Sequence, residues 1–313
     1  MSSSTNGASS EDAADAASSA GHIAIVTDST AYLPRPTMVR HCIVAVPLTV
    51  VLGDRALEEG TEISARSLAE ALREHRPVTT SRPSPEVFAE TYRAAAAAGA
   101  RGVVSLHLSG EFSGTYDAAL LAAREAPVPV RVVDSGVVAM ALGFCAVAAA
   151  EAAEAGGTLD EVVAAAEKRA LGTSTYFYVD TLDYLRRGGR IGAAQALLGS
   201  ALAVKPLLEL ADGRIGMLEK VRTASKAIGR LEEIVVERAG GAGTAGPAAV
   251  HGRAGARVDI AVHHLAAPER AEQLAARLRE RVVGLGELHV SEVGAVIGAH
   301  TGPGLLGAVV SPR

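Results

Sequence analysis

A small set of hydroxyl side chains and one histidine stands where the sequence predicts strands and loops to end: Thr80, Ser81, Ser113, Thr115 and His300. Hydroxyls and free backbone amides at helix N-termini suit an anion such as a carboxylate, because the helix dipole and the unpaired donors both favour negative charge. Helix capping is the simpler interpretation of Ser81, Ser84 and Ser113. These residue types therefore indicate either an anion-binding site or ordinary caps.

An enzyme is one alternative, namely a Ser/His hydrolase or acyltransferase with Ser113 as nucleophile and His300 as base. The chain has no GxSxG nucleophile elbow, and Ser113 lies in a Gly-x-x-Ser-Gly sequence of different geometry. This absence counts against the hydrolase. A module that binds a small carboxylate through the same residues is a third possibility.

Familiar nucleotide and metal motifs are missing from the sequence. There is no GxxxxGK motif followed by Ser or Thr, and the nine histidines show no HExxH or similar ligand spacing. The stretch from Gly302 to Gly307 matches GxGxxG, but only residues 308–313 follow it, so no βαβ unit can form there. A tight turn is the simpler interpretation, although its free amides could face a ligand. His263-His264 reads as the end of a strand, and we expect no cofactor and no metal.

Composition indicates a folded protein with no global attraction to nucleic acid. Hydrophobic residues make up 49% of the 313 residues and charged residues 21%, while the net charge is -5 and the sequence pI is about 6.0. Aromatic residues are only 3%, with no Trp, which argues against recognition of nucleic acid by stacked rings. The core must therefore consist mainly of Ala, Val, Leu and Ile.

The cysteines and the N-terminal segment point to the cytoplasm. Cys42 and Cys145 are too few for a disulfide framework and are expected to be buried, reduced thiols. Residues 1–21 are rich in Ser, Ala and acidic residues and lack the basic and apolar regions of a secretory signal, which predicts a disordered tail. No apolar run reaches the ~18 residues that span a bilayer.

The elements that must position the hydroxyls form two α/β domains, 22–170 and 171–313. In the first, continuous apolar strands predict a mostly parallel, Rossmann-like sheet with helices on both faces, and ligands bind such sheets beyond the carboxyl ends of the strands. Its predicted strands are 22–27, 41–52, 102–108 and 130–133; its predicted helices are 61–76, 86–98, 116–126 and 137–153; residues 79–85 are a loop.

The second domain is expected to contain a mixed sheet. Strands are predicted at 173–179, 258–263 and 294–299, with weak alternation at 214–221. Helices are predicted at 225–238 and 268–283, and the segment 182–211 is expected to be largely helical apart from Gly188-Gly189. Residues 240–255 are rich in Gly, Ala and Pro, which predicts a flexible loop.

A series of short motifs between residues 22 and 313 resembles the DegV family in content and order. The motifs are Thr27-Asp-Ser-Thr30, Thr80-Ser-Arg-Pro-Ser84, Leu108-Ser-Gly-Glu-Phe-Ser-Gly-Thr-Tyr116, Val133-Asp-Ser-Gly136, Leu185-Arg-Arg-Gly-Gly-Arg-Ile191, Lys205-Pro206, Val221-Arg-Thr223 and Gly298-Ala-His-Thr-Gly-Pro-Gly304. Each motif alone is weak, but together they are highly specific.

The resemblance implies a non-catalytic, cytoplasmic bacterial protein that holds one long-chain fatty acid in a tunnel between its two domains. It further implies a separate ATP-dependent fatty acid kinase as partner, which phosphorylates the carboxylate, so that the acyl phosphate enters phospholipid synthesis. Transient contact with a membrane is compatible with this role, and no nucleic acid is implied.

The family's carboxylate contacts carry over to Thr80, Ser113 and His300, with Ser81, Gly114 and Thr115 as neighbours. Arg190 and Arg222 match basic positions that contact phosphate or the kinase. In one departure, Arg82 stands where the family usually has Gln; pointing inward it would add positive charge near the head group, and pointing outward it would alter the partner surface. The segment 240–255 is also longer than usual.

Overall fold

The computed structural model describes residues 21–197, 205–240 and 257–313. Its strands form a four-stranded sheet, a six-stranded sheet and a three-stranded sheet. The expected disordered tail (1–21) falls outside these residues except for Gly21, and the expected flexible loop (240–255) falls outside them except for Gly240. The division into domains after residue 170 stays a prediction.

The four-stranded sheet is entirely parallel, as the continuous apolar strands predict, with the order β2-β1-β6-β7. Its strands are β1 (Ile23–Asp28), β2 (Val44–Val46), β6 (Gly102–His107) and β7 (Val130–Asp134). All six residues of β6 are buried, as expected for a strand covered on both faces.

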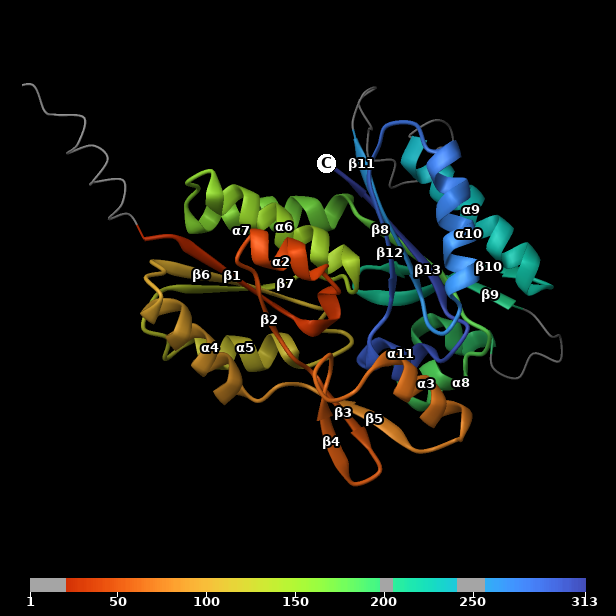
Figure 1. Cartoon of the computed structure of the whole chain (residues 1–313), viewed down its shortest axis with the longest axis horizontal. Helices are drawn as coiled ribbons and strands as arrows, with labels where there is room; N and C mark the ends of the chain where they lie inside the picture. Colours follow the sequence, from red (N-terminus) through yellow and green to blue (C-terminus); the bar gives the residue numbers. More distant parts are fainter. Residues whose placement is uncertain (1–20, 198–204, 241–256) are drawn as a thin grey trace, which may run out of the picture.

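Helices cover both faces of this sheet (Figure 1). On one face lie α4 (Pro85–Ala97) and α5 (Thr115–Ala123), and on the other lie α6 (Met140–Glu154) and α7 (Leu159–Gly172). The first pair buries Phe88, Tyr92 and Ala119 against the sheet. Small residues, mostly Ala, dominate α6 and allow it to pack closely on β1 and α7.

The six-stranded sheet is mixed, with the order β10-β9-β8-β13-β11-β12. Its strands are β8 (Ser174–Tyr178), β9 (Lys205–Ala211), β10 (Arg214–Val221), β11 (Val258–His264), β12 (Leu285–Glu292) and β13 (Leu306–Pro312). Only β11 and β12 pair in parallel. α9 (Ala224–Gly240) and α10 (Pro268–Arg281) pack on this sheet and are joined by ion pairs from Glu232 to Arg277 and Arg281.

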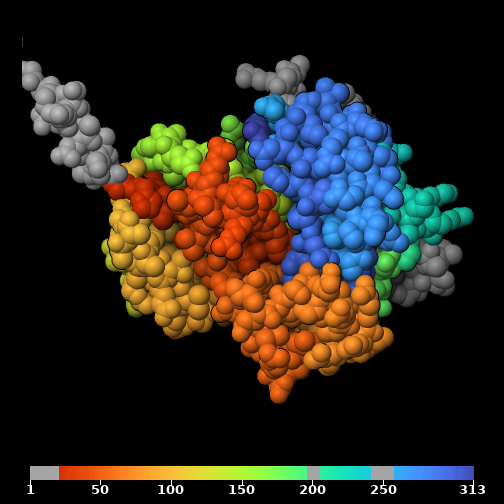
Figure 2. Space-filling model, viewed as in Figure 1, coloured from red at the N-terminus to blue at the C-terminus, as the bar shows by residue number. Residues whose placement is uncertain are grey.

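The small antiparallel sheet consists of β4 (Arg55–Glu58), β3 (Thr49–Leu52) and β5 (Val78–Ser81), in that order. With α3 (Ala65–Arg73) it packs against α11 (Ala295–Thr301), so it joins the first half of the chain to the last. Figure 2 shows this unit, in orange, beneath the two larger parts of the molecule. The remaining short elements are η1 (Ser29–Ala31), α2 (Arg35–Arg40), α8 (Asp183–Arg187) and η2 (Gly192–Leu197).

Two predictions for the first half are wrong in detail. The expected strand 41–52 is divided at Pro47 into β2 and β3, which belong to different sheets, because proline has no N–H for a ladder hydrogen bond. The expected loop 79–85 begins as the edge strand β5, paired with β3, and becomes a loop only at Arg82. Cys145 is buried as predicted, but Cys42 is exposed, in a turn with φ of 49°.

Two further predictions are wrong in the second half. The segment 182–211 holds only the short helices α8 and η2 before β9, since Gly189 and Gly192 take positive φ and interrupt a helix. The expected strand 294–299 is the helix α11, since a short apolar run does not distinguish strand from helix. Several further elements were not predicted from sequence, among them η1, α2, β4, α7, β12 and β13. No helix in the described part of the chain is long and apolar enough to cross a bilayer.

Candidate functional site

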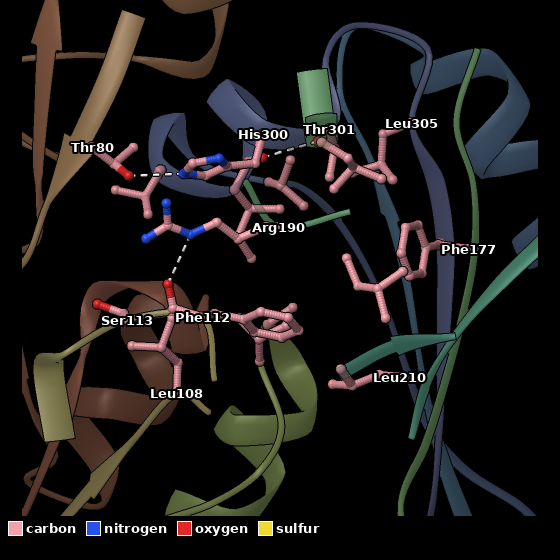
Figure 3. A pocket seen from close by; sticks show the side chains of 18 of the residues that line it. Thr80, Leu108, Phe112, Ser113, Phe177, Arg190, Leu210, His300, Thr301 and Leu305 are labelled. Carbon is pink, nitrogen blue, oxygen red and sulfur yellow. Dashed lines mark hydrogen bonds between the residues drawn. The ribbon is translucent and has the colours of Figure 1, made fainter. Parts of the chain in front are cut away.

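A cavity of about 500 Å³ lies between the loops of the parallel sheet and the six-stranded sheet. Its wall combines residues from β5 and the loop after it, the loop after β6, the segment just before α6, five strands of the six-stranded sheet, and α11. Figure 3 shows polar side chains gathered at one end and apolar side chains at the other. The cavity is therefore amphipathic along its length.

Thr80 and His300 form the centre of the polar end. Thr80 Oγ1 and His300 Nε2 are 2.8 Å apart, joining β5 to α11 (Figure 3). Ser113 lines the same end, and its hydroxyl lies 2.8 Å from that of Thr115. Thr115 itself is fully buried at the start of α5 and does not line the cavity. The expected site residues thus converge, with Thr115 in a supporting position.

His300 is a neutral imidazole at pH 7. Burial lowers its pKa to about 4, and the nearby positive charge of Arg190 acts in the same direction. Its Nδ1 is buried and has no hydrogen-bond partner among the described residues. The ring packs directly on Gly188, where an added Cβ would lie 2.1 Å from Nδ1. Any side chain at position 188 would collide with the His300 ring, which explains why the first residue of the Gly-Gly-Arg motif is glycine.

Arg190 lines the polar end and points into the cavity (Figure 3). Its Nε donates to the Phe112 carbonyl at 3.0 Å, and its Nη1 donates to the Gly188 carbonyl at 2.6 Å. These bonds hold the guanidinium in one orientation beside His300 and the loop that carries Ser113. Arg190 therefore belongs to the cavity wall.

Arg222 lies elsewhere. It is exposed and follows β10, whose opposite end contributes Ile215 to the cavity. At the usual rise per residue, Arg222 lies roughly 23 Å along the strand from Ile215, and it does not line the cavity. The structure therefore does not bring Arg222 together with Arg190.

The remaining expected residues lie at the opening of the cavity. Ser81, Arg82 and Gly114 all line it, and the Ser81 hydroxyl donates to the Arg82 carbonyl at 3.3 Å. The Arg82 side chain lies against the backbone of Gly114, so it points toward the head-group end rather than away from it. It adds a second positive charge there.

Acidic residues of two motifs hold the loop that carries Ser113. The Asp28 carboxylate accepts hydrogen bonds from the Leu108 and Thr30 backbone N–H groups at 2.9 and 3.1 Å. Asp134 accepts from the Gly110 N–H at 3.1 Å. These carboxylates face the backbone, so they position the loop and do not belong to the cavity wall.

Glu59, which the sequence did not single out, positions α11. Its carboxylate accepts from the Val296 N–H at 2.7 Å, from the Tyr32 hydroxyl at 3.2 Å and from the Ser29 hydroxyl. Burial raises the pKa of Glu59. The network fixes the start of α11, the helix that carries His300 in its last turn. An isolated Glu after a strand gives no sequence signal for this role.

The residues of the apolar end were not identified from the sequence, because they have the types and patterns of ordinary core residues. Phe177, Leu210 and Leu305 lie there, opposite the polar end (Figure 3). Two polar residues, Thr175 and His263, also belong to the cavity wall. His263 is held by hydrogen bonds to its backbone and side-chain neighbours. Its Nε2 accepts from the Met140 N–H at 3.2 Å, and its Nδ1 lies 3.0 Å from the Ser291 hydroxyl. Because an N–H group only donates, the proton of this neutral ring is on Nδ1.

The cavity offers hydrogen-bond donors for an anion at one end and an aliphatic chamber behind it. Within the described residues no cluster of His, Cys, Asp or Glu could hold a metal ion. The fold and site together define an α/β protein with three sheets and an amphipathic cavity that opens to solvent at its polar end.

Comparison with known proteins identifies the family. A family model described as an uncharacterised protein, DegV family, matches residues 22–313. A DegV domain-containing protein of Streptomyces coelicolor is 76% identical over 292 residues, which are 93% of this chain and 99% of the relative. The chain belongs to the DegV family.

Solved structures of DegV proteins share the fold. A fatty-acid-binding DegV family protein from Thermus thermophilus superposes with a TM-score of 0.84 at 35% identity, over 93% of this chain and 100% of that one. DegV of Bacillus subtilis, described as a fatty acid binding protein, gives a TM-score of 0.83 at 33% identity, over 94% and 100% of the two chains. The expected fold class, a mostly parallel sheet and a mixed sheet, is confirmed.

Proposed function

We propose that this protein binds one long-chain fatty acid in its cavity and presents the carboxylate to a separate ATP-dependent fatty acid kinase. The observation that carries the proposal is the amphipathic cavity, polar at Thr80, Ser113 and His300 and apolar at Phe177, Leu210 and Leu305. Its volume of about 500 Å³ is within the usual range of small-molecule sites, roughly 300–1,000 Å³. The fatty-acid-binding relatives from Thermus thermophilus and Bacillus subtilis support the same ligand class.

The two ends of the cavity have different energetic roles. Burial of about 15 methylenes offers roughly 12 kcal/mol of gross transfer free energy at ~0.8 kcal/mol each. A charge-assisted hydrogen bond contributes only about 1.5–3 kcal/mol net. The apolar chamber therefore supplies most of the affinity, and the polar end determines which way the ligand lies.

The head-group end consists of Thr80, Ser113 and His300, with Ser81 and Gly114 beside them and Thr115 holding the Ser113 hydroxyl. The hydroxyls of Thr80 and Ser113 donate hydrogen bonds to the carboxylate. His300 Nε2–H donates to Thr80 Oγ1 and so orients that hydroxyl, and Arg190 supplies positive charge next to them. Placement of the carboxylate near the opening leaves it accessible to a phosphoryl donor.

The kinase is a separate protein, and this chain needs no cofactor of its own. Arg190, half-buried beside the head group, stabilises the transferring phosphoryl group, while exposed Arg222 contributes to the surface that meets the kinase. The acyl phosphate then enters phospholipid synthesis. We place this activity in the cytoplasm, with transient membrane contact for loading.

An acyl hydrolase is the alternative, and the geometry disfavours it. The Ser113 hydroxyl is bonded to Thr115, whereas His300 Nε2 is bonded to Thr80. His300 Nδ1 has no carboxylate partner in the part of the chain that the structure describes. A triad needs its histidine on the nucleophile and an acid behind the histidine. A site for a small carboxylate is disfavoured by the long apolar chamber.

Mass spectrometry under native and then denaturing conditions tests the proposal. We expect a fatty acid that stays on the native protein and leaves on denaturation, and formation of acyl phosphate only when kinase and ATP are both present. An acyl adduct on Ser113, or steady ester hydrolysis that Ser113→Ala abolishes, would establish the hydrolase instead. A native mass with no lipid after incubation with hexadecanoic acid would contradict fatty-acid binding.

A further inference from the structure

Arg82 occupies a defined position at the opening of the cavity. Its side chain lies flat on the backbone at the start of α5, because a Cβ added to Gly114 would be 2.1 Å from Arg82 Nη1 and 3.1 Å from both Cδ and Cζ. Arg82 is exposed and also lines the cavity, so it lies where the cavity meets solvent. Ser113, next to Gly114, and Thr80, two residues before Arg82, line the same end.

The Arg82 guanidinium differs from the other arginines near the site in having no partner. Arg190 donates to two carbonyl oxygens, and Arg214 forms an ion pair with Glu111 at 2.8 Å. Within residues 21–197, 205–240 and 257–313, Arg82 forms no hydrogen bond through its guanidinium and no ion pair. Its donors are therefore free to turn toward a ligand.

The hydroxyls and the imidazole around Arg82 do not distinguish a charged head group from a neutral one. The hydroxyls of Thr80 and Ser113 both donate and accept, so they suit an alcohol as well as a carboxylate. His300 is neutral at pH 7 for the reasons given above. Arg190 donates hydrogen bonds from Nε and Nη1 to backbone carbonyl oxygens. Arg82 is the group at this end that only donates, carries a full positive charge and has no protein partner.

We propose that Arg82 is a specificity-determining residue that makes this cavity select an ionised carboxylate over a neutral polar head group on the same aliphatic chain. This inference rests on the proposed function, since it concerns the head group of the lipid in that cavity. Discrimination arises because the neutral head group leaves the guanidinium without an anion, while the hydroxyls serve both ligands equally.

The test compares binding of hexadecanoic acid and hexadecanol to the delipidated full chain. For wild type we expect the acid to bind more tightly than the alcohol. Arg82→Gln should weaken binding of the acid about three- to tenfold and leave the alcohol within about twofold, a range that allows for solvent screening of an exposed charge. Arg82→Lys should retain part of the preference, because it keeps the charge but not the planar fork.

Salt and two further variants separate charge from packing. Wild-type affinity for the acid should fall between about 50 mM and about 500 mM salt, and Arg82→Gln should lose part of that dependence. Gly114→Ala, whose backbone φ of -75° suits alanine, displaces the Arg82 side chain without changing charge and should weaken acid binding as Arg82→Gln does. Arg93→Gln on α4 removes the same charge from an exposed position outside the cavity wall and should change neither ligand.

Each contrary result has a distinct meaning. Equal wild-type affinity for acid and alcohol overturns the role of Arg82 while leaving lipid binding intact. An equal loss of both ligands in Arg82→Gln also overturns it, because the side chain would then act through apolar contact of its stem. Failure of wild type to bind either ligand contradicts the proposed function itself, and the role of Arg82 with it.

Discussion

Thr80 Oγ1 and His300 Nε2 lie 2.8 Å apart although 220 positions separate the two residues in the chain. Thr80 is on the edge strand β5 of the small sheet, and His300 is near the end of α11. The hydrogen bond therefore joins the two halves of the chain at the head-group end of the cavity. It makes the geometry of this end dependent on the packing of α11 against the small sheet.

The double variant Thr80→Val with Ser113→Ala should impair presentation of the carboxylate more than it impairs lipid binding. Two hydroxyls are lost from the polar end, whereas the apolar chamber that supplies most of the affinity is unchanged. We expect lipid retention to fall by less than about tenfold, and kinase-dependent acyl phosphate yield to fall further. Thr79→Val, at an exposed position of the same strand, is the control. Equal losses in the two assays would show that the two ends do not have separate roles.

Gly188→Ala should displace His300 and destabilise the fold. The backbone at 188, with φ of -75°, accepts alanine, but the new Cβ would lie 2.1 Å from His300 Nδ1. Overpacking of this kind costs about 1–3 kcal/mol, measured as the loss of unfolding free energy in urea. Gly229→Ala in α9 is the matched control, because a Cβ there has nothing within 4 Å, and it should be neutral or slightly stabilising. Unchanged stability and lipid retention in Gly188→Ala would refute the close packing.

Stability should decrease as the pH falls from 6.5 to 4, in part through His263. Burial lowers the pKa of His263 from its ordinary value of about 6.5 to about 4, so the unfolded chain binds more protons between these two pH values. The stabilising contribution is therefore complete above pH 6.5 and is lost as the pH falls through 4, with a limit of about 3 kcal/mol. Protonation also makes Nε2 a donor facing the Met140 N–H.

The contribution of His263 to the pH dependence of stability can be measured by urea unfolding of His263→Gln at several pH values between 4 and 7. The glutamine oxygen can accept from the Met140 N–H and does not titrate, so the variant should show a shallower pH dependence than wild type. The same change at exposed His22 should leave the wild-type slope in place. A slope in His263→Gln as steep as in wild type would exclude His263 as a source of the pH dependence.

Arg190→Ala and Arg222→Ala should differ from each other. Arg190 lines the head-group end, so its loss should reduce lipid retention a few-fold and acyl phosphate yield more strongly. Arg222 is exposed and remote, so its loss should leave lipid retention unchanged and lower only the kinase-dependent yield, most clearly at low salt. An Arg222→Ala protein with wild-type yield at every salt concentration would remove this residue from the partner surface.

The sequence alone determined the elements whose patterns are unambiguous. Continuous apolar strands identified the four parallel strands except at Pro47, and the ordered motifs identified the family. The motifs also named residues that converge in the cavity, among them Thr80, Ser113 and His300. These features could be predicted because an apolar strand pattern and a short motif are visible in the sequence itself, without knowledge of the folded neighbours.

Only the tertiary structure decided which long-range neighbours these residues have. Residues 295–301 form a helix, and the Glu59 carboxylate accepts a hydrogen bond from the Val296 N–H at its start. The Arg82 side chain lies against Gly114. The tertiary structure also placed Arg190 in the cavity wall and Arg222 far from it. A short apolar run and a surface arginine carry no local signal for these outcomes, since each depends on partners that only the folded chain brings together.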